Sequence, residues 1–290
     1  MDALLDHASD ANAFSYFGVF IVIALCECMV PRRQPGDALP LRWFGNVALS
    51  ILNTLLARAL FPILGMGFAV VCEQHGWGLL NNLRWPAWVE FTITILVMDL
   101  TLYAQHYFLH RFDFLWRLHR THHTDHDFDV TTGLRFHPLE MTFTTALLLV
   151  TVAALGPPPT AIFIFHLLST SLGFFQHANL KMPASVDTAL RMLLVTPDMH
   201  RIHHSVIPTE GRSNFGSTFP WWDRLFRTYI DQPAAGHADM RFGVEGFEER
   251  KHLTLPWMLA QPFLREDSDS GLLMSAALIS ARRRKKEKCV

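Results

Sequence analysis

The chain is poor in cysteine and in charged residues. Its four cysteines, Cys26, Cys28, Cys72 and Cys289, form no CxxC pair, so the sequence predicts neither a disulfide framework nor a thiolate zinc site. Only 18% of the 290 residues are charged and the formal net charge is −1, which argues against a nucleic-acid partner. Half of the residues are hydrophobic, and the mean hydropathy is +0.18. This composition is typical of a polytopic membrane protein with a sizeable polar portion.

Long apolar runs predict the membrane-spanning segments. Residues 13–30, 47–72 and 88–109 are each long enough to cross about 30 Å of hydrocarbon as a helix. Two shorter runs, 141–155 and 160–175, are joined by a Gly-Pro-Pro-Pro sequence and predict a helical hairpin that need not span the bilayer fully. We therefore expect an all-α, polytopic helical membrane protein.

Basic residues predict the orientation of these segments. Arginines are frequent after the first and third runs, at Arg32, Arg33, Arg42, Arg111, Arg117, Arg120 and Arg135, whereas only Arg84 follows the second run. By the positive-inside rule the amino terminus lies outside and the loop after the third run is cytoplasmic. The hairpin returns the chain to the same side, where the basic tail 282–286 also lies.

Eight of the sixteen histidines form three short motifs beside these apolar runs. The motifs are HxxxH at His106 and His110, HxxHH at His119, His122 and His123, and HxxHH at His200, His203 and His204. Helical residues three or four positions apart share a face, so each motif aims its imidazoles in one direction. Neutral imidazole binds iron, zinc, copper and nickel, and eight imidazoles exceed what one ion can coordinate. A lone HxxxH is more often structural, but the three motifs together predict a site with two metals, carried by a helical cap on the cytoplasmic side.

The third run also carries an acidic residue at membrane depth. Asp99, Tyr103, His106 and His110 are spaced four, three and four apart and therefore line one helical stripe. An ionisable side chain inside a membrane is costly and is usually functional. Asp99 either accepts the free ring N–H of a ligating histidine or bonds a neighbouring helix, and both interpretations stay open.

The motifs, in this order and spacing, resemble the histidine boxes of the fatty acid hydroxylase and sterol desaturase superfamily of membrane diiron enzymes. The resemblance extends over 91–230. Segment 135–140 (RFHPLE) resembles an intermediate HP segment, 176–179 (QHAN) a histidine after the hairpin, and 196–200 (TPDMH) the approach to the last box. Segments 214–216 and 222–229 are similar to NYG and WDrlFGTY stretches, with Phe215 and Arg227 in place of the usual Tyr and Gly. We expect these two changes to affect packing more than metal binding.

The resemblance implies an enzyme that uses O2 to hydroxylate or desaturate a C–H bond of a lipid, such as a sterol or a fatty acyl chain. It implies two iron ions (Fe2+/Fe3+), for which zinc could substitute. The implied ligands are His106, His110, His119, His122, His123, His137, His177, His200, His203 and His204. Asp99, Asp198, Asn214, Trp222 and Asp223 are expected to support the ligands or their scaffold.

The resemblance also predicts a division of the chain and a partner. Residues 1–87 form amino-terminal transmembrane segments, 88–232 a catalytic domain that includes the hairpin 139–176, and 233–290 a cytoplasmic region with the basic tail. The sequence contains no CxxCH, no GxGxxG after a strand and no HPGG-like haem segment. Electrons are therefore expected from a separate protein, a cytochrome b5 or a ferredoxin with its reductase. Arg111, Arg117, Arg120 and Arg201 either attract such an acidic donor or bind lipid headgroups, and both interpretations stay open.

Two other classes of protein use histidine clusters. A zinc-dependent membrane hydrolase is expected to carry a general-base Glu within a box, as in HExxH, and none of the three boxes does. A non-catalytic metal-binding protein or transporter is expected to place its ligands near the bilayer midplane on broken helices. The boxes favour the oxygenase, and they resemble those of enzymes that act on different lipids, so they do not identify the substrate.

Overall fold

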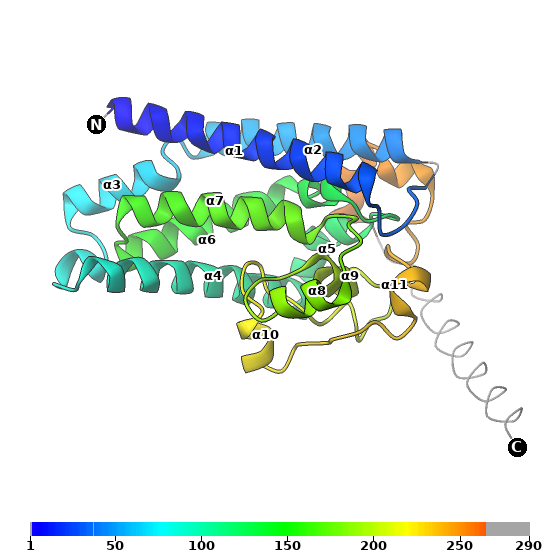
Figure 1. The fold of residues 1–290 in the computed structure, drawn as a ribbon. Helices are drawn as coiled ribbons and strands as arrows, with labels where there is room; N and C mark the ends of the chain where they lie inside the picture. The colour runs from blue at the N-terminus through cyan, green and yellow to red at the C-terminus, as the bar shows by residue number, and fades with distance from the viewer. Residues whose placement is uncertain (1, 37, 265–290) are drawn as a thin grey trace, which may run out of the picture.

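The computed structural model describes residues 2–36 and 38–264, and among them there is no β-strand (Figure 1). The long helices are α1 (Asp2–Met29), α2 (Leu39–Leu60), α4 (Ala87–Arg111), α6 (Pro138–Leu155) and α7 (Pro159–Gln176), and a shorter helix, α3 (Gly65–His75), lies between α2 and α4 in the chain. Four stretches are long and apolar enough to cross a membrane, namely Leu39–Asn82, Ala87–Arg111, Pro138–Leu155 and Pro159–Gln176. The predicted all-α membrane fold is confirmed. The basic tail 282–286 lies outside the described residues.

The second apolar run, 47–72, lies within the candidate span Leu39–Asn82, but it is divided between two helices and does not form one continuous helix. Helix α2 ends at Leu60, and α3 begins at Gly65. Pro62 lies between them, and proline cannot continue a helix because it has no amide hydrogen and its ring clashes with the preceding turn. Helix α3 has only 11 residues and lies at the end of the bundle away from the cap (Figure 1).

The long helices lie side by side in one bundle (Figure 1). Helix α1 packs on α7 and α2 on α6, while α3 and α4 each contact both α6 and α7. Ala69, Met98, Val152 and Phe165 form the buried contact among these last four helices. The outward faces are also apolar, with exposed Phe17, Ile21, Ile51, Leu55 and Trp88. A bundle that is apolar inside and outside suits a bilayer, whose hydrocarbon covers the outer faces.

Short helices form a cap where α1, α4 and α7 end (Figure 1). They are α5 (Asp113–His123), η2 (Val130–Leu134), α8 (Ala184–Leu190), α9 (Pro197–His203), α10 (Trp221–Leu225), α11 (Gly236–Asp239), η3 (Arg250–Leu253), α12 (Leu255–Ala260) and η4 (Gln261–Phe263); η1 (Leu80–Asn82) lies between α3 and α4. The cap contains two of the three histidine motifs, and the first motif closes α4 beneath it.

A buried ion pair fixes the start of α2 to the cap. Arg42 donates from Nη2 to Asp125 Oδ2 at 2.9 Å and from Nη1 to Asp129 Oδ2 at 2.8 Å. Burial raises the pKa of Asp125, but the Arg42 guanidinium lowers it more, and this pKa lies well below its ordinary value. Asp125 follows His123 by two residues, so the ion pair fixes the chain immediately after the second histidine motif.

Candidate metal centre

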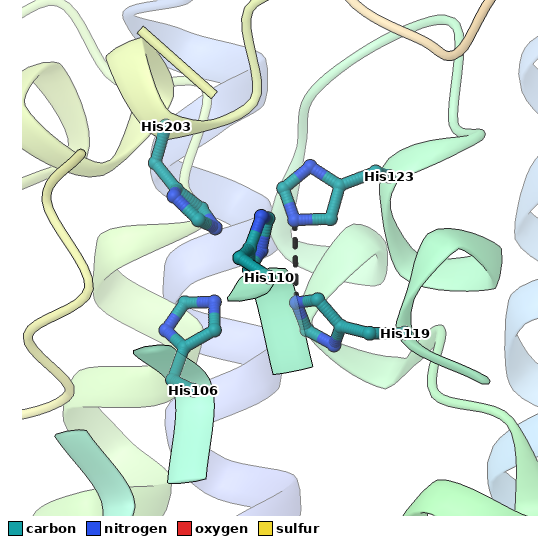
Figure 2. A group of neighbouring side chains, drawn as sticks. All are labelled: His106, His110, His119, His123 and His203. Carbon is teal, nitrogen blue, oxygen red and sulfur yellow. Dashed lines mark hydrogen bonds between the residues drawn. The ribbon is translucent and has the colours of Figure 1, made fainter. Parts of the chain in front are cut away.

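Nine histidines converge in two neighbouring groups. The five-histidine group contains His106, His110, His119, His123 and His203, and the four-histidine group contains His122, His177, His200 and His204. Within each group the candidate ligand nitrogens all lie within 4.8 Å of one another. Figure 2 shows the rings of the five-histidine group pointing toward a shared centre. Seven of the nine side chains are buried, and His106 and His110 are half-buried.

Each motif contributes according to helical geometry. Pairs four residues apart stay together, as His119 with His123 on α5 and His200 with His204 at the end of α9. The middle histidine of each HxxHH motif, His122 or His203, joins the other group, because a neighbouring position on a helix is turned by about 100°. Helices α5 and α9 therefore each supply both groups.

Capping interactions at its amino-terminal end stabilise the short helix α9. Thr196 is its N-cap, and its Oγ1 accepts the amide hydrogen of Met199 at 3.3 Å. The same hydroxyl donates to Asp187 Oδ1 at 2.6 Å, which attaches the cap residue to α8. Pro197 occupies the first helical position, where its missing amide hydrogen has no cost. The TPDMH segment therefore begins the helix that presents the third motif.

Fixed acceptors orient several of the rings. Ring Nδ1 donates to a backbone carbonyl in His106 (Phe215 O, 2.9 Å), His177 (Gly173 O, 2.6 Å) and His203 (Ser213 O, 2.7 Å). A neutral imidazole carries one N–H, so each of these rings has the lone pair on Nε2. Nε2 is the nitrogen that faces the other histidines, which is the arrangement of a ligand held by a second layer of hydrogen bonds.

The ring Nε2 atoms that face the centre of each group are placed to bind a metal ion rather than to hydrogen-bond to one another. Nε2 of His106, His110 and His203 is buried and has no hydrogen-bond partner among the described residues. In the four-histidine group, His177 Nε2 lies 3.1 Å from His122 Nε2 and 3.0 Å from His200 Nε2. Nitrogens about 2.1 Å from one ion would be about 3.0–3.4 Å apart. The arrangement therefore matches two sets of imidazole ligands.

Burial keeps these imidazoles neutral, which is the ligating form. Loss of hydration lowers the pKa of His177 to about 4 and that of His203 to about 3. The same cause, with repulsion from neighbouring imidazoles, lowers the pKa of His122, His123, His200 and His204 well below the ordinary value. At neutral pH these nitrogens are available to a cation.

Glu140 is a partner of the site that the sequence analysis missed. It lies in the first turn of α6, is only 2% exposed, and accepts from His119 Nδ1 at 2.7 Å through Oε1. A glutamate three residues after His137, at the start of a long apolar run, was the available signal. Carboxylates commonly orient ligating histidines in this way.

His137 lies in neither group. Its Nδ1 accepts the amide hydrogen of Leu139 at 3.1 Å as the N-cap of α6, and its Nε2 lies 3.3 Å from the carbonyl of Leu259. Both ring nitrogens therefore have partners away from the two groups. We leave His137 out of the proposed ligands for this reason. His126 also lies elsewhere, with Nε2 2.6 Å from Phe247 O.

Asp99 contacts the cap segment that follows the third motif rather than a histidine ring. Its carboxylate accepts from the backbone amides of Thr218 (3.0 Å) and Phe219 (3.3 Å) and from the indole N–H of Trp222 (2.8 Å). Asp99 is completely buried, so these three donors replace its hydration. The residue attaches the middle of α4 to the cap.

Asp223 helps to orient His106 indirectly, through hydrogen bonds with the backbone of Phe215. Its two carboxylate oxygens accept from the amides of Phe215 and Gly216, both at 2.8 Å. The carbonyl of Phe215 in turn accepts from His106. Asp223 therefore fixes the segment that orients His106.

Asn214 and Asp198 stabilise the surrounding scaffold. Asn214 has a left-handed φ of 54° and donates to the carbonyls of Met199 (3.0 Å) and Ile230 (2.9 Å). Asp198 pairs with Arg32 at 3.2 Å and with Arg201 at 3.4 Å. These contacts join the third motif to the rest of the cap without touching the nine rings.

One cavity of about 650 Å³ meets both groups. Its walls include His106 and His119 from one group and His122, His177 and His200 from the other. From there it extends between α2, α4, α6 and α7 as far as Leu64 and His166. Thr54 and Arg58 on α2 also line the cavity and are exposed. A ligand that enters between the membrane helices can therefore reach both histidine groups.

The chain is similar to known lipid hydroxylases and monooxygenases. The Fatty acid hydroxylase family matches residues 91–228, which contain all nine histidines. An ornithine lipid hydroxylase of Rhizobium tropici is 26% identical over 260 residues, which is 87% of this chain and 75% of the relative. An alkylglycerol monooxygenase of Xenopus tropicalis is 26% identical over 245 residues (82% and 53%), and methylsterol monooxygenase 1 of Danio rerio is 31% identical over 156 residues (50% and 48%). The chain thus spans about half the length of these last two relatives. No solved structure matches significantly.

Proposed function

Because the chain belongs to the fatty acid hydroxylase superfamily, we propose that it is an integral-membrane oxygenase that binds two iron ions and uses O2 to oxidise a C–H bond of a lipid. The observation that carries this proposal is the pair of all-imidazole groups at the end of one cavity between membrane helices. The three relatives are named as hydroxylase or monooxygenases of lipids, which favours hydroxylation over desaturation.

The five-histidine group would hold one ion and the four-histidine group the other. Bound iron supplies one-electron and O2 chemistry that no side chain can supply. Imidazole also suits zinc, so iron is proposed from the superfamily and from the reaction rather than from the ligands. The all-histidine set differs from the ferritin-like bundles, whose di-iron sites rest on glutamates and Glu-x-x-His pairs.

The protein itself would orient ligands and substrate. Backbone carbonyls hold the Nδ1 hydrogens of His106, His177 and His203, so that their lone pairs face inward. Glu140 does the same for His119. A lipid bound in the cavity would lie beside both groups.

Electrons would come from a separate donor, a cytochrome b5 or a ferredoxin with its reductase. We place the cap on the cytoplasmic side and the amino terminus outside, from the distribution of arginines. Of the arginines that were expected to attract an acidic donor, Arg120 and Arg201 are buried, whereas Arg111 and Arg117 are exposed. Arg111 and Arg117 are therefore the residues we propose for this contact.

The test starts from full-length protein purified in mild detergent without a chelator. We expect about two irons per chain by plasma mass spectrometry, and their loss in the His200→Ala/His203→Ala variant. The iron-loaded protein is then given membrane lipids, a reductant and isotopically labelled O2, and the product is analysed by mass spectrometry.

Label from O2 in the lipid product supports the oxygenase. Label from isotopically labelled water instead would identify a hydrolase, and metal binding without any product would leave a non-catalytic protein. His126→Ala is the matched control, because His126 lies near the cap but outside both groups, and it should retain metal and activity.

A further inference from the structure

We infer that one part of the cap, residues 217–227 together with Met192 and Leu193, is immersed in the lipid bilayer beside α4. Its exposed apolar side chains form an interaction surface for lipid that none of the four candidate spans contains. The inference concerns how the cap is attached to the membrane, and it holds whatever reaction the histidine groups support.

Five large apolar side chains form an exposed patch on the cap, which we call the α8–α10 patch. Met192 and Leu193 follow α8, Trp221 and Leu225 begin and end α10, and Phe226 comes directly after it. Each of the five is between 39% and 65% exposed. The indole N–H of Trp221 donates to the carbonyl of Met192 at 2.8 Å, so the two stretches lie side by side. A contiguous apolar surface of this kind usually marks a contact with a membrane or with another protein.

The bonds of Asp99 hold this part of the cap at membrane depth. Asp99 is the central residue of α4 (Ala87–Arg111), which is one of the candidate spans. Its carboxylate accepts from the amides of Thr218 and Phe219 and from the indole of Trp222. At a rise of 1.5 Å per residue, Asp99 lies about 18 Å along the helix from Arg111, where α4 ends beneath the cap. The segment therefore extends down the side of the span instead of staying above its end.

Two further contacts fix the segment against the membrane helices. Tyr103, one turn nearer the cap than Asp99, stacks on Phe226 with ring centroids 5.4 Å apart, and its hydroxyl lies 2.9 Å from Thr228 Oγ1. Phe219 packs against the buried cluster that contains Met98 of α4 and Val152 of α6. Figure 1 shows α10 beside the part of α4 that leads to the cap. The position of the α8–α10 patch is thus set by buried contacts with the spans.

The charges of the segment suit a lipid surface. Asp223, the one acidic residue of 217–227, is completely buried, whereas Arg224 and Arg227 are exposed. Arg224 is directed toward the cap, since its Nη2 donates to the carbonyl of Arg191 at 2.7 Å and its guanidinium carbon lies 4.8 Å from the ring centroid of Tyr229. Exposed apolar side chains with basic residues beside them are typical of segments that lie in the headgroup and acyl boundary and contact lipid phosphates. The leaflet on the cap side is therefore the partner of the patch.

Spin labels on the full-length chain test this placement. The native cysteines are first removed, by Cys26→Ser, Cys28→Ser, Cys72→Ala and Cys289→Ser. Leu193→Cys and Leu225→Cys then each carry one nitroxide label, in nanodiscs of phosphatidylcholine and phosphatidylglycerol that hold one chain each. Power-saturation electron paramagnetic resonance measures how often the label collides with O2, which partitions into hydrocarbon, and with a neutral nickel chelate, which stays in water.

Two matched labels give the reference values. Leu55→Cys lies on the candidate span of α2 and is the membrane reference, because Leu55 is 61% exposed, close to the 60% of Leu193 and the 65% of Leu225. Glu248→Cys is the water reference, because Glu248 is an exposed acidic residue of the cap. We expect the ratio of O2 to nickel collisions at Leu193 and Leu225 to be close to that at Leu55 and well above that at Glu248. A melting curve of each labelled variant checks that the fold is retained.

A ratio at Leu193 and Leu225 like that at Glu248 would overturn the inference, because the patch would then face water. The same labels are also measured in liposomes at high chain density, where a second copy can approach. Spin–spin broadening at Leu193 and Leu225, absent at Leu55, would assign the patch to a contact between two chains and would also overturn the inference. Neither measurement needs metal or turnover, so the outcome is independent of the proposed function.

Discussion

His119 and Glu140 lie 2.7 Å apart, from ring Nδ1 to carboxylate Oε1, and join α5 to the first turn of α6. The carboxylate fixes the ring so that Nε2 faces His123, 3.2 Å away. A negative partner also makes the opposite nitrogen a stronger ligand. The contact therefore connects a membrane helix directly to the five-histidine group.

Glu140→Gln should weaken metal binding at the five-histidine group. The amide keeps the shape but removes the charge that holds the His119 ring, and changes to such partners typically cost about 10- to 100-fold in metal affinity. Competition against a chelator of known affinity measures the change. Glu90→Gln is the control. Glu90 lies in the first turn of α4, at the opposite end of that helix from His110, and this substitution should leave the metal affinity unchanged. Equal affinities in wild type and Glu140→Gln would contradict the role given to Glu140.

The adjacent residues His203 and His204 should each be needed to bind a different metal ion. His203→Ala removes a ligand of the five-histidine group, and His204→Ala removes one from the four-histidine group. We expect each variant to fall from about two metals per chain to about one, with the fold retained. Metal analysis together with a melting curve checks this. Loss of both ions in either variant would show that the groups do not load independently.

Asp99→Ala should lower stability without emptying the metal groups. Three N–H donors from the cap lose their acceptor, and leaving such groups unpaired costs roughly 1–3 kcal/mol each. Asp99→Asn keeps one acceptor oxygen and should lose less. The measurements are denaturant unfolding in detergent and metal per folded chain. A loss of metal at unchanged stability would instead place Asp99 in support of a ligand.

Stability of the metal-free protein should fall as the pH falls from about 6.5 to about 4. The pKa values of His177 and His203 are about 4 and about 3 in the folded protein, against an ordinary value of 6.5. In this window the unfolded chain binds protons that the folded chain does not, so acid favours unfolding, by up to about 1.4 kcal/mol per pH unit for each histidine. Above the ordinary histidine pKa, His177 and His203 are neutral in both the folded and the unfolded chain, so they do not make stability depend on pH.

Denaturant unfolding of chelator-treated protein across this window tests the dependence. The His177→Ala/His203→Ala variant should show a shallower slope, because two of the titrating groups are gone. A slope of opposite sign in the wild type would mean that these rings are charged in the folded state.

The histidine motifs could be predicted from the sequence because helical spacing alone puts His119 and His123, or His200 and His204, on one face. Their division between two groups could not, since it depends on how α4, α5, α7 and α9 pack. The break at Pro62 is local, yet the hydropathy on both sides is continuous and conceals it. The family match confirms the resemblance that the motifs predicted.

The partners of Asp99 show the limit of local patterns. Its position at membrane depth indicated a role, but its donors lie about 120 residues later in the chain. Only the tertiary fold brings them together. Glu140 is similar, because its partner His119 precedes it by 21 residues on another helix.

The chain order of the ligands has a consequence for biogenesis. Helix α9 contributes to both histidine groups, and it follows α7, the last of the candidate spans. A ribosome therefore completes every one of those spans before either group has its full set of rings. We therefore expect the full set of ligands to bind metal only after these spans have been synthesised.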